Sequence, residues 1–470
     1  MLSFVILSYH EGSIYYKFSS LNLNLIFCQK GGSVPGQFKR CIFGFFFVLI
    51  LFAPLMTADE IPSILNLKER APVFDKWLRI RLEKVLPGVM RRENFDMWLV
   101  ICREYNEDPV FLTLVPDTSL SARRLTMLVF YDRREGGIER LTVSRYGIEG
   151  FYKAVWEPEK IDQWQCLVQV IKERNPKRIG INESDTFAFG DGLSVSLKAK
   201  LIQALGPEYS SRLHSAERVA VGWLEKRTPE ELDVYPHIVA IAHQIIAEAF
   251  SPDVITPGVT TNEDVVWWMR ERISKLGLTT WFQPSISIQR PKEGEPKDPV
   301  IRRGDLLHCD MGIDYLHLNT DTQEHAYVLR VGEEDCPQGL KDALAAGNRL
   351  QDILLAEFKE GRPGNEILAS ALKKAKEQGL KPSIYTHPLG FHGHAAGPTI
   401  GLWDKQNGVP GDGDYPLYYD TCYSIELNVK ANVPEWGNQE VTIALEEDAA
   451  FTKSGISFID GRQTSLYLIN

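Results

Sequence analysis

Four acidic residues in the second half of the chain have the types and surroundings that could do chemistry. Asp310, Asp321, Glu426 and Glu446 each stand in or beside an apolar, strand-like segment. An ionised carboxylate in a buried strand is costly unless it is paired or bound to a metal ion. Each one alone could be an acid satisfied by backbone donors at a strand end. Four of them in one part of the chain are hard to explain by core packing.

Histidines gather in the same part of the sequence. His387, His392 and His394 are three of the ten histidines and lie within eight positions, among several glycines. Imidazole is a good ligand for divalent transition metals, and glycine lets the backbone approach closely. A surface loop with histidines gathered by chance is the alternative.

Together these residues have the charge of a binuclear metal site. Two divalent cations about 3.5–4 Å apart need roughly four compensating charges and bridging carboxylates between them. The four acids supply these charges, and one neutral imidazole completes the set.

This pattern resembles the pita-bread metallopeptidases (family M24), which include methionine aminopeptidase, aminopeptidase P and prolidase. The order Asp, Asp, His, Glu, Glu, with eleven positions between the two Asp, is specific to that family. Asp310 stands in Asp-x-Gly, His394 in Gly-His-x-x-Gly, and Glu446 in a Glu-Glu-Asp…Thr ending at Thr452. The resemblance covers roughly residues 228–460. It implies an α+β pita-bread domain with a pseudo-twofold internal repeat.

The resemblance also implies metal ligands. Asp310 would bind one metal ion, Asp321 and Glu446 would bridge both, and His394 and Glu426 would complete the second. Two divalent ions are therefore expected. Mn suits carboxylate and imidazole ligands and is the expected metal, with Co, Fe and Zn as alternatives.

Three residues are candidates for catalysis. Glu426 is a carboxylate beside the nucleophile and would shuttle its proton. His387 or His392 would hydrogen-bond the substrate carbonyl or the tetrahedral intermediate.

The chain departs from the aminopeptidase P pattern at positions that contact substrate in that family. Counted from His394, the family's histidine seven positions later is Gly401, and its histidine four positions earlier is Gly390. The family's histidine upstream of the first Asp is also missing from residues 282–287.

We therefore expect a dimetal exopeptidase that cleaves the N-terminal bond of Xaa-Pro peptides. A prolidase-type dipeptidase and a non-hydrolytic peptide-binding or protein-binding member of the fold are alternatives. A metal-independent creatinase-like hydrolase ranks last, because it would lack the carboxylate set. The complete ligand set favours a peptidase, since a member that had lost catalysis would be expected to lack at least one ligand.

Length and composition agree with an enzyme of this kind. The chain has 470 residues, which is more than one typical domain of about 150. Its net charge of −10 argues against a nucleic-acid partner, which usually needs a basic face. We expect a peptide substrate and, as in many members of the family, a homo-oligomer.

The N-terminal region is typical of a targeting segment. Residues 41–56 are almost wholly apolar, follow Lys39 and Arg40, and are followed by small residues, as in a secretory signal peptide. An uncleaved membrane anchor is the alternative. Translation is expected to begin near Val34, which would leave residues 1–33 untranslated. An exported protein, periplasmic or secreted, is expected.

The expected organisation is a targeting segment over residues 1–58, a creatinase-like α/β domain over 59–225, and the metallopeptidase domain over 226–470. Hydrophobic periodicity predicts a helix over 70–86 and strands over 97–102, 126–131 and 178–181. A capping box at Thr228 predicts a helix to about residue 250, and Thr261 predicts another that ends at Gly277. A third helix is expected after Pro363.

Overall fold

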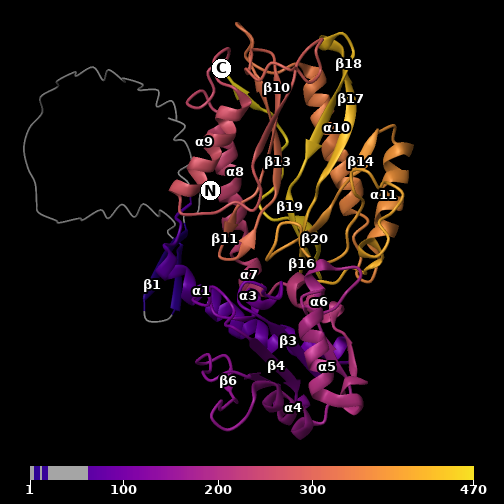
Figure 1. The fold of residues 1–470 in the computed structure, drawn as a ribbon. Coiled ribbons are helices and arrows are strands. Elements are labelled where there is room, and N and C mark those ends of the chain that lie inside the picture. The colour runs from indigo at the N-terminus through magenta and orange to yellow at the C-terminus, as the bar shows by residue number, and fades with distance from the viewer. Residues whose placement is uncertain (1–4, 11–12, 19–61) are drawn as a thin grey trace, which may run out of the picture. The chain divides into compact units, whose positions relative to one another are not determined.

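The structure is a computed structural model that describes residues 5–10, 13–18 and 62–470 (Figure 1). Contacts divide the chain into two units, residues 1–58 and 59–470. In the first, β1 (Val5–His10) pairs antiparallel with β2 (Ser13–Phe18), where the sequence predicted no element. The apolar segment over 41–56 lies outside the described residues. None of the described helices is long and apolar enough to cross a membrane.

An α/β domain with a six-stranded sheet precedes the half of the chain that carries the candidate acids. The strand order is β6-β5-β4-β3-β7-β8, with β3, β7 and β8 parallel and β3, β4 and β5 antiparallel. Its strands are β3 (Met97–Cys102), β4 (Thr126–Asp132), β5 (Ile138–Thr142), β6 (Lys153–Ala154), β7 (Ile179–Ile181) and β8 (Leu213–Ser215). Its helices include α3 (Phe111–Leu114), α4 (Gln163–Arg174), α5 (Val195–Ser210) and α6 (Glu217–Glu225). The three predicted strands are confirmed.

The first long helical segment is longer than predicted. It comprises α1 (Leu67–Ile80), a π-helical stretch (Arg81–Val85) and α2 (Leu86–Arg92). Asn66 begins it with a capping box, in which its side chain accepts from the backbone N–H of Glu69 at 3.2 Å. The prediction missed this start because it followed only the apolar period.

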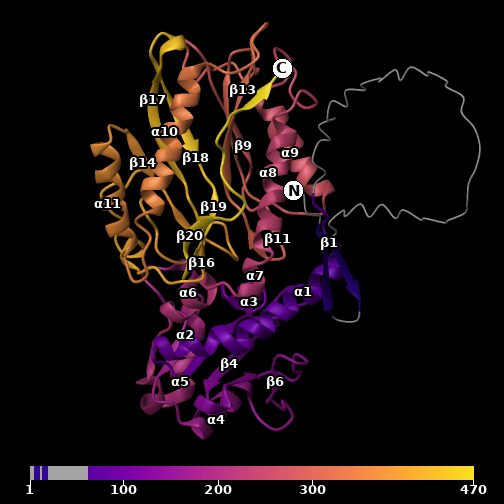
Figure 2. The ribbon, with the colours of Figure 1, turned by 180° about the vertical axis from the view of Figure 1, so that it is seen from behind.

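The second half consists of two sheet-and-helix halves and a shared central sheet (Figures 1 and 2). In the first, α8 and α9 lie against the sheet β21-β13-β10-β9. In the second, α10 and α11 cover the sheet β14-β17-β18. The sheet β15-β16-β19-β20 completes the domain. The helices are α7 (Pro229–Leu232), α8 (Tyr235–Ala249), α9 (Asn262–Lys275), α10 (Gln338–Leu355) and α11 (Gly364–Glu377).

The strands of this half are mostly short. In chain order they are β9 (Ser285–Gln289), β10 (Leu306–Met311), β11 (Asp314–Tyr315), β12 (Leu318–Asn319), β13 (Thr322–Val328), β14 (Pro382–Ile384), β15 (His387–Leu389), β16 (Thr421–Ser424), β17 (Leu427–Val433), β18 (Gln439–Leu445), β19 (Asp448–Thr452), β20 (Gly455–Phe458) and β21 (Tyr467–Ile469).

The predicted helix boundaries are largely confirmed. Thr228 and Thr261 each make a capping box, and Gly277 takes a positive φ of 67° just after α9. The helix predicted from Thr228 to about residue 250 is instead two helices, α7 and α8. Pro236 stands at the start of α8, where a proline without an N–H is tolerated, and the chain turns before it.

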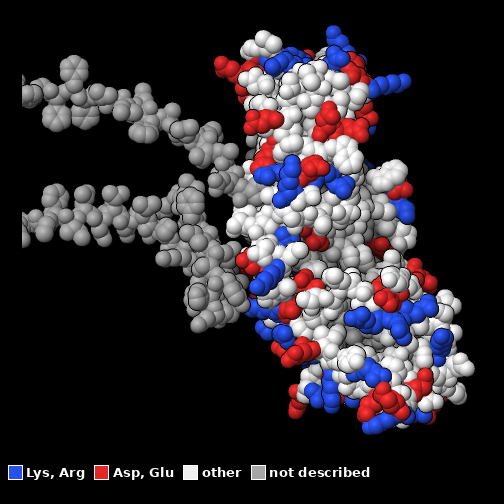
Figure 3. Space-filling view, turned by 60° about the vertical axis from the view of Figure 1, so that its left-hand side comes forward, with Lys and Arg blue, Asp and Glu red and all other residues white. Residues whose placement is uncertain are grey.

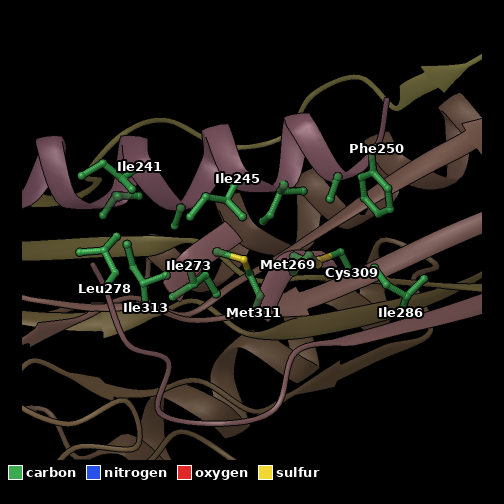
Figure 4. Close-up of a cluster of buried hydrophobic side chains, with 14 of the residues drawn as sticks. Ile241, Ile245, Phe250, Met269, Ile273, Leu278, Ile286, Cys309, Met311 and Ile313 are labelled. Carbon is green, nitrogen blue, oxygen red and sulfur yellow. The ribbon is translucent and has the colours of Figure 1, made fainter. Parts of the chain in front are cut away.

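A buried apolar layer joins α8 and α9 to the sheet that carries part of the candidate site. Figure 4 shows side chains of α8 and α9 facing those of β9 and β10. Burying one such side chain contributes roughly 1.5–3 kcal/mol. The layer therefore holds β10 firmly, including its outer end at Met311, which is fully buried.

The surface and the cysteines give no sign of another kind of site. Basic and acidic side chains are interspersed on the face that Figure 3 shows. Within residues 62–470, all five cysteines are buried free thiols: Cys102, Cys166, Cys309, Cys336 and Cys422.

Candidate metal centre

The hairpin between β10 and β13 brings the two aspartates together. β10 pairs antiparallel with β13, so that Asp310 lies opposite Gln323, and Asp321 immediately precedes β13. The chain reverses between β11 and β12 through Leu316 and His317, which have positive φ values of 58° and 60°. Asp321 therefore lies across a turn from Asp310.

The other acids lie where strands are interrupted. Glu426 stands between β16 and β17, and Glu446 stands between β18 and β19. Gln323 pairs with Glu446 through the backbone, with N–O distances of 3.0 and 3.3 Å in the two directions. This bridge joins the two halves of the domain and places Glu446 beside the aspartates.

His387 completes the convergence from β15. Its Nε2 lies 3.2 Å from Glu446 Oε1 and 3.4 Å from Asp321 Oδ2. Its Nδ1 lies 3.0 Å from the carbonyl oxygen of Pro388 and donates to it, so that Nε2 is the nitrogen that faces the acids. This is the usual arrangement of a metal-binding imidazole.

The predicted acids converge in overlapping groups whose ligand atoms lie within 4.8 Å of one another. The groups are Asp310, Asp321 and Glu446; His387, Glu426 and Glu446; and Asp321, His387 and His394. The structure therefore gathers the four predicted acids around His387, with His394 at the edge.

Two buried oxygens in this cluster have no hydrogen-bond partner. They are Asp310 Oδ1 and Asp321 Oδ1. A second group, His243, Glu324 and Glu447, also has ligand atoms within 4.8 Å of one another. In this group, however, both ring nitrogens of the histidine already face carboxylate oxygens of the protein. His243 Nε2 lies 3.1 Å from Glu447 Oε2, while its Nδ1 lies 2.9 Å from Asp460 Oδ2. Only the first group therefore offers free acceptors to a cation.

The raised pKa values of the acids indicate that the cluster needs a cation if all its carboxyl groups are to be ionised at neutral pH. Burial, followed by the charge of Glu446, raises the pKa of Asp310 to about 8 and that of Glu426 to about 10. Burial, the charge of Glu446 and the charge of Asp310 raise the pKa of Asp321 well above its usual value. Such closely spaced carboxylates can all be ionised at neutral pH only when positive charge lies between them.

The two histidines differ in their surroundings. Burial lowers the pKa of His387, but the hydrogen bond and charge of Glu446 outweigh it, so that this pKa is raised. Burial and the neighbouring His387 lower the pKa of His394 to about 4, so His394 is neutral at pH 7. His394 is exposed, and its Nε2 lies 3.4 Å from the hydroxyl of Tyr385.

The geometry favours His387 over His394 as the imidazole ligand. It also removes one departure from the family pattern, because the residue seven positions after His387 is His394. The sequence assigned the ligand to His394 from its Gly-His-x-x-Gly context. The strand register that places His387 opposite Ser424, next to Glu426, could not be read from spacing.

His392 lies outside the groups that could hold a metal ion. Its ring lies 4.3 Å from that of Phe189, in the short 3₁₀ helix Ala188–Gly190 of the N-terminal domain. Burial and Arg227 lower the pKa of His392 to about 4. His392 contacts the N-terminal domain, and a direct role for it in the chemistry stays a prediction.

Sequence reasoning missed two kinds of residue beside the cluster. Gln323 donates from Nε2 to Glu426 Oε1 at 3.1 Å and to Glu446 Oε2 at 2.6 Å. Its position two residues after Asp321 would have placed it on the same face of a strand. The ring of Trp281 lies 5.0 Å from that of His394 and against Gly393, where a Cβ would overlap it. No sequence signal pointed to Trp281.

Residues 237–453 match the family model of Metallopeptidase family M24. Among solved structures, the chain is similar to the X-Pro aminopeptidase from Thermotoga maritima MSB8, with 17% identity, a TM-score of 0.58 and coverage of 81% of this chain and 99% of that one. The Xaa-Pro dipeptidase from Bacillus anthracis is 16% identical, with a TM-score of 0.58 and coverage of 83% of this chain and 99% of that one. A variant of Escherichia coli aminopeptidase P is 14% identical, with a TM-score of 0.54 and coverage of 86% of this chain and 97% of that one. No curated protein matches the chain.

These matches confirm the resemblance read from the sequence. The second half of the chain is a metallopeptidase domain of the M24 pita-bread family, and an N-terminal domain precedes it. At this level of identity, the solved structures show the fold and leave the substrate open. The domain boundary at residues 225–226 stays a prediction.

The residues present fit the pair of divalent metals expected of this family. Asp310 Oδ1 and Asp321 Oδ1 are buried acceptors without partners, and the neighbouring acids repel one another. Asp310, Asp321, His387, Glu426 and Glu446 would hold the ions.

Proposed function

We propose that this protein is a dimetal-dependent exopeptidase that hydrolyses the N-terminal bond of Xaa-Pro peptides. The observation that carries the proposal is the convergence of two buried acids, Asp321 and Glu446, and two half-buried acids, Asp310 and Glu426, around His387, with two acid oxygens left free. The names of two similar solved structures, X-Pro aminopeptidase and Xaa-Pro dipeptidase, support Xaa-Pro peptides as the substrate class.

The metal ions, when bound, would lower the pKa of a water molecule and polarise the scissile carbonyl. Glu426 would accept the proton from that water. Gln323 occupies Oε1 of Glu426, so that Oε2 is the oxygen available for the proton. Glu426 would then deliver the proton to the leaving nitrogen.

His394 would contact the substrate. It is neutral at pH 7 and exposed beside the acids, so that one ring nitrogen can donate a hydrogen bond to the substrate carbonyl. Trp281 and Tyr385 lie on either side of it, with ring centroids 5.0 and 5.8 Å away. These aromatic faces offer an apolar surface to a prolyl ring.

An assay with two substrates tests the proposal. Protein loaded with Mn²⁺, Co²⁺ or Zn²⁺ is given an Xaa-Pro-Xaa tripeptide and an Xaa-Pro dipeptide, with an Xaa-Ala-Xaa tripeptide as the control. Release of the first residue from the tripeptide supports the aminopeptidase. Cleavage of the dipeptide alone supports the prolidase-type alternative. If the protein cleaves none of these peptides with any of the three metals, the proposal that it is a hydrolase is wrong.

We also propose that the chain is exported through its N-terminal apolar segment and works as a homo-oligomer. The support for export is the basic pair followed by the apolar segment over 41–56. N-terminal sequencing of the protein from the source cell tests the export, and light scattering of the mature protein tests the assembly. A mature protein that begins at Met1, or one that scatters as a monomer, would contradict the respective proposal.

A further inference from the structure

Gln323 makes contacts that the proposed reaction does not itself require. Its Nε2 donates to Glu426 Oε1 at 3.1 Å and to Glu446 Oε2 at 2.6 Å. One amide thus holds two acids that come from different strand interruptions. Gln323 is 5% exposed and lies opposite Asp310 in the β10–β13 ladder, so water cannot easily take its place.

His308 fixes the direction of this amide. His308 Nε2 lies 2.9 Å from Gln323 Oε1. An amide oxygen only accepts, so His308 donates from Nε2 and its Nδ1 is the acceptor. The hydroxyl of Ser287 lies 3.4 Å from that Nδ1 and can donate to it. The amide therefore turns its N–H₂ group, and not its oxygen, toward the acids.

The sheet places these residues in line. Ser287 on β9 is the cross-strand partner of His308 on β10. His308 and Asp310 are two residues apart on β10 and so point to the same face.

We propose that Ser287, His308 and Gln323 form a positioning relay that holds one oxygen each of Glu426 and Glu446. The relay leaves Glu426 Oε2 for the proton and keeps Glu446 Oε1, which also accepts from the hydroxyl of Ser424 at 2.6 Å, facing His387 and the site that would hold the metal ions. All the hydrogen bonds of the relay run in one direction, from hydroxyl to imidazole to amide to carboxylate. The donated hydrogen bonds also offset part of the repulsion between the two acids. The kinetic part of this inference rests on the proposed function, whereas the metal-binding part does not.

Loss of hydrogen-bonded partners behind metal ligands typically lowers metal affinity or activity by about 10–100-fold. The test uses Gln323→Met and His308→Leu, which remove successive members of the relay, and the double variant. His308→Gln is a rescue variant, because its side-chain amide can also donate to Gln323. Gln289→Met is the matched control. Gln289, on β9, also has a side-chain amide. It donates to the backbone carbonyl of Thr442 at 2.7 Å and accepts from the backbone N–H of Thr442 at 2.9 Å, and it does not contact the acids.

Calorimetric titration with Mn²⁺ and steady-state kinetics on an Xaa-Pro-Xaa tripeptide give the readouts. Gln323→Met is expected to weaken Mn²⁺ binding by about 10–100-fold and to lower kcat more than it raises KM. The effects of Gln323→Met and His308→Leu should be non-additive, because both break the same chain. His308→Gln should recover part of the loss, and Gln289→Met should leave Mn²⁺ affinity unchanged.

Additive effects of the two variants, or Mn²⁺ affinity in Gln323→Met equal to that of the natural protein, would overturn the relay. A loss of thermal stability in Gln323→Met as large as in Gln289→Met, without any change in Mn²⁺ affinity, would show a purely structural role and also overturn it. If the natural protein binds Mn²⁺ but cleaves no peptide, the proposed function fails while the titrations still decide the relay.

Discussion

Nε2 of His387 lies 3.2 Å from Oε1 of Glu446, and the other ring nitrogen donates to a backbone carbonyl. His394 faces the same cluster from its exposed edge. The two histidines therefore have different surroundings, although they are only seven positions apart.

Replacing these two histidines separately is expected to divide metal binding from substrate binding. His387→Ala should weaken Mn²⁺ binding by at least about 10-fold, because a direct ligand is lost. His394→Ala should retain Mn²⁺ and raise KM or lower kcat. Calorimetric titration and peptide kinetics on both variants provide the comparison. Strong metal loss in His394→Ala with normal binding in His387→Ala would restore His394 as the ligand, as its sequence context first suggested.

Glu426→Gln is expected to keep most of the bound metal and lose turnover. The amide can still offer an oxygen ligand but cannot take a proton, and a general base contributes about 10²–10⁴-fold. Elemental analysis and kcat measure the two effects. Glu440→Gln, at an exposed acid that pairs with Lys381, is the control and should change neither. A Glu426→Gln enzyme with normal kcat would show that Glu426 does not transfer the proton.

Asp321→Ala should lose metal as well as activity. Asp321 is 3% exposed and lies between Asp310, Glu446 and His387, so its side chain reaches both halves of the site. Elemental analysis after dialysis checks this, with the exposed acid Asp352 changed to Ala as the control. A dialysed Asp321→Ala protein that retains both ions would show that Asp321 bridges nothing.

The acids of the candidate metal centre could be recognised from sequence because their chemistry leaves an uneven pattern, with single acids in or beside apolar, strand-like segments. Helix starts at Thr228 and Thr261 could also be predicted, since a capping box acts within four residues. The choice between His387 and His394 could not, because it depends on which residue pairs with Ser424 in a neighbouring strand. Gln323 was missed for the same reason, since its partners Glu426 and Glu446 are more than 100 positions away.

The metal-free protein is expected to lose stability as the pH rises. The pKa of Asp310 is raised to about 8 and that of Glu426 to about 10, while in the unfolded chain both acids ionise near pH 4. Between these values the unfolded state binds fewer protons than the folded state, so the free energy of unfolding falls with pH. His243, with its pKa raised to about 11 by Asp460 and Glu447 against the effect of burial, acts in the same direction above about pH 6.5.

Thermal unfolding of metal-free protein between pH 5 and pH 9 measures this slope. Saturating Mn²⁺ should flatten it, because bound cations keep the acids ionised in the folded state. A metal-free protein that becomes more stable from pH 5 to pH 9 would contradict the assigned shifts.

The junction between the N-terminal domain and the metallopeptidase domain contains a buried ion pair. Arg81 Nη1 lies 3.0 Å from Glu231 Oε2, with 1% and 0% of the two side chains exposed. Arg81 also donates from Nη1 to the carbonyl oxygen of Lys226 at 2.6 Å and from Nη2 to that of Trp223. Glu231 in turn closes the capping box at Thr228, from which the first helix of the metallopeptidase domain begins.

Arg81→Met is therefore expected to destabilise the protein by up to about 3–5 kcal/mol, because it removes the nearer of the two buried guanidinium groups that pair with Glu231 and leaves only Arg227, whose Nη1 lies 3.6 Å from Glu231 Oε1. Urea unfolding measures the loss. Lys373→Met, which breaks the exposed pair with Glu377 at 4.0 Å, is the control and should cost at most about 0.5 kcal/mol. Equal stability of Arg81→Met and Lys373→Met would show that the two domains are joined by other contacts.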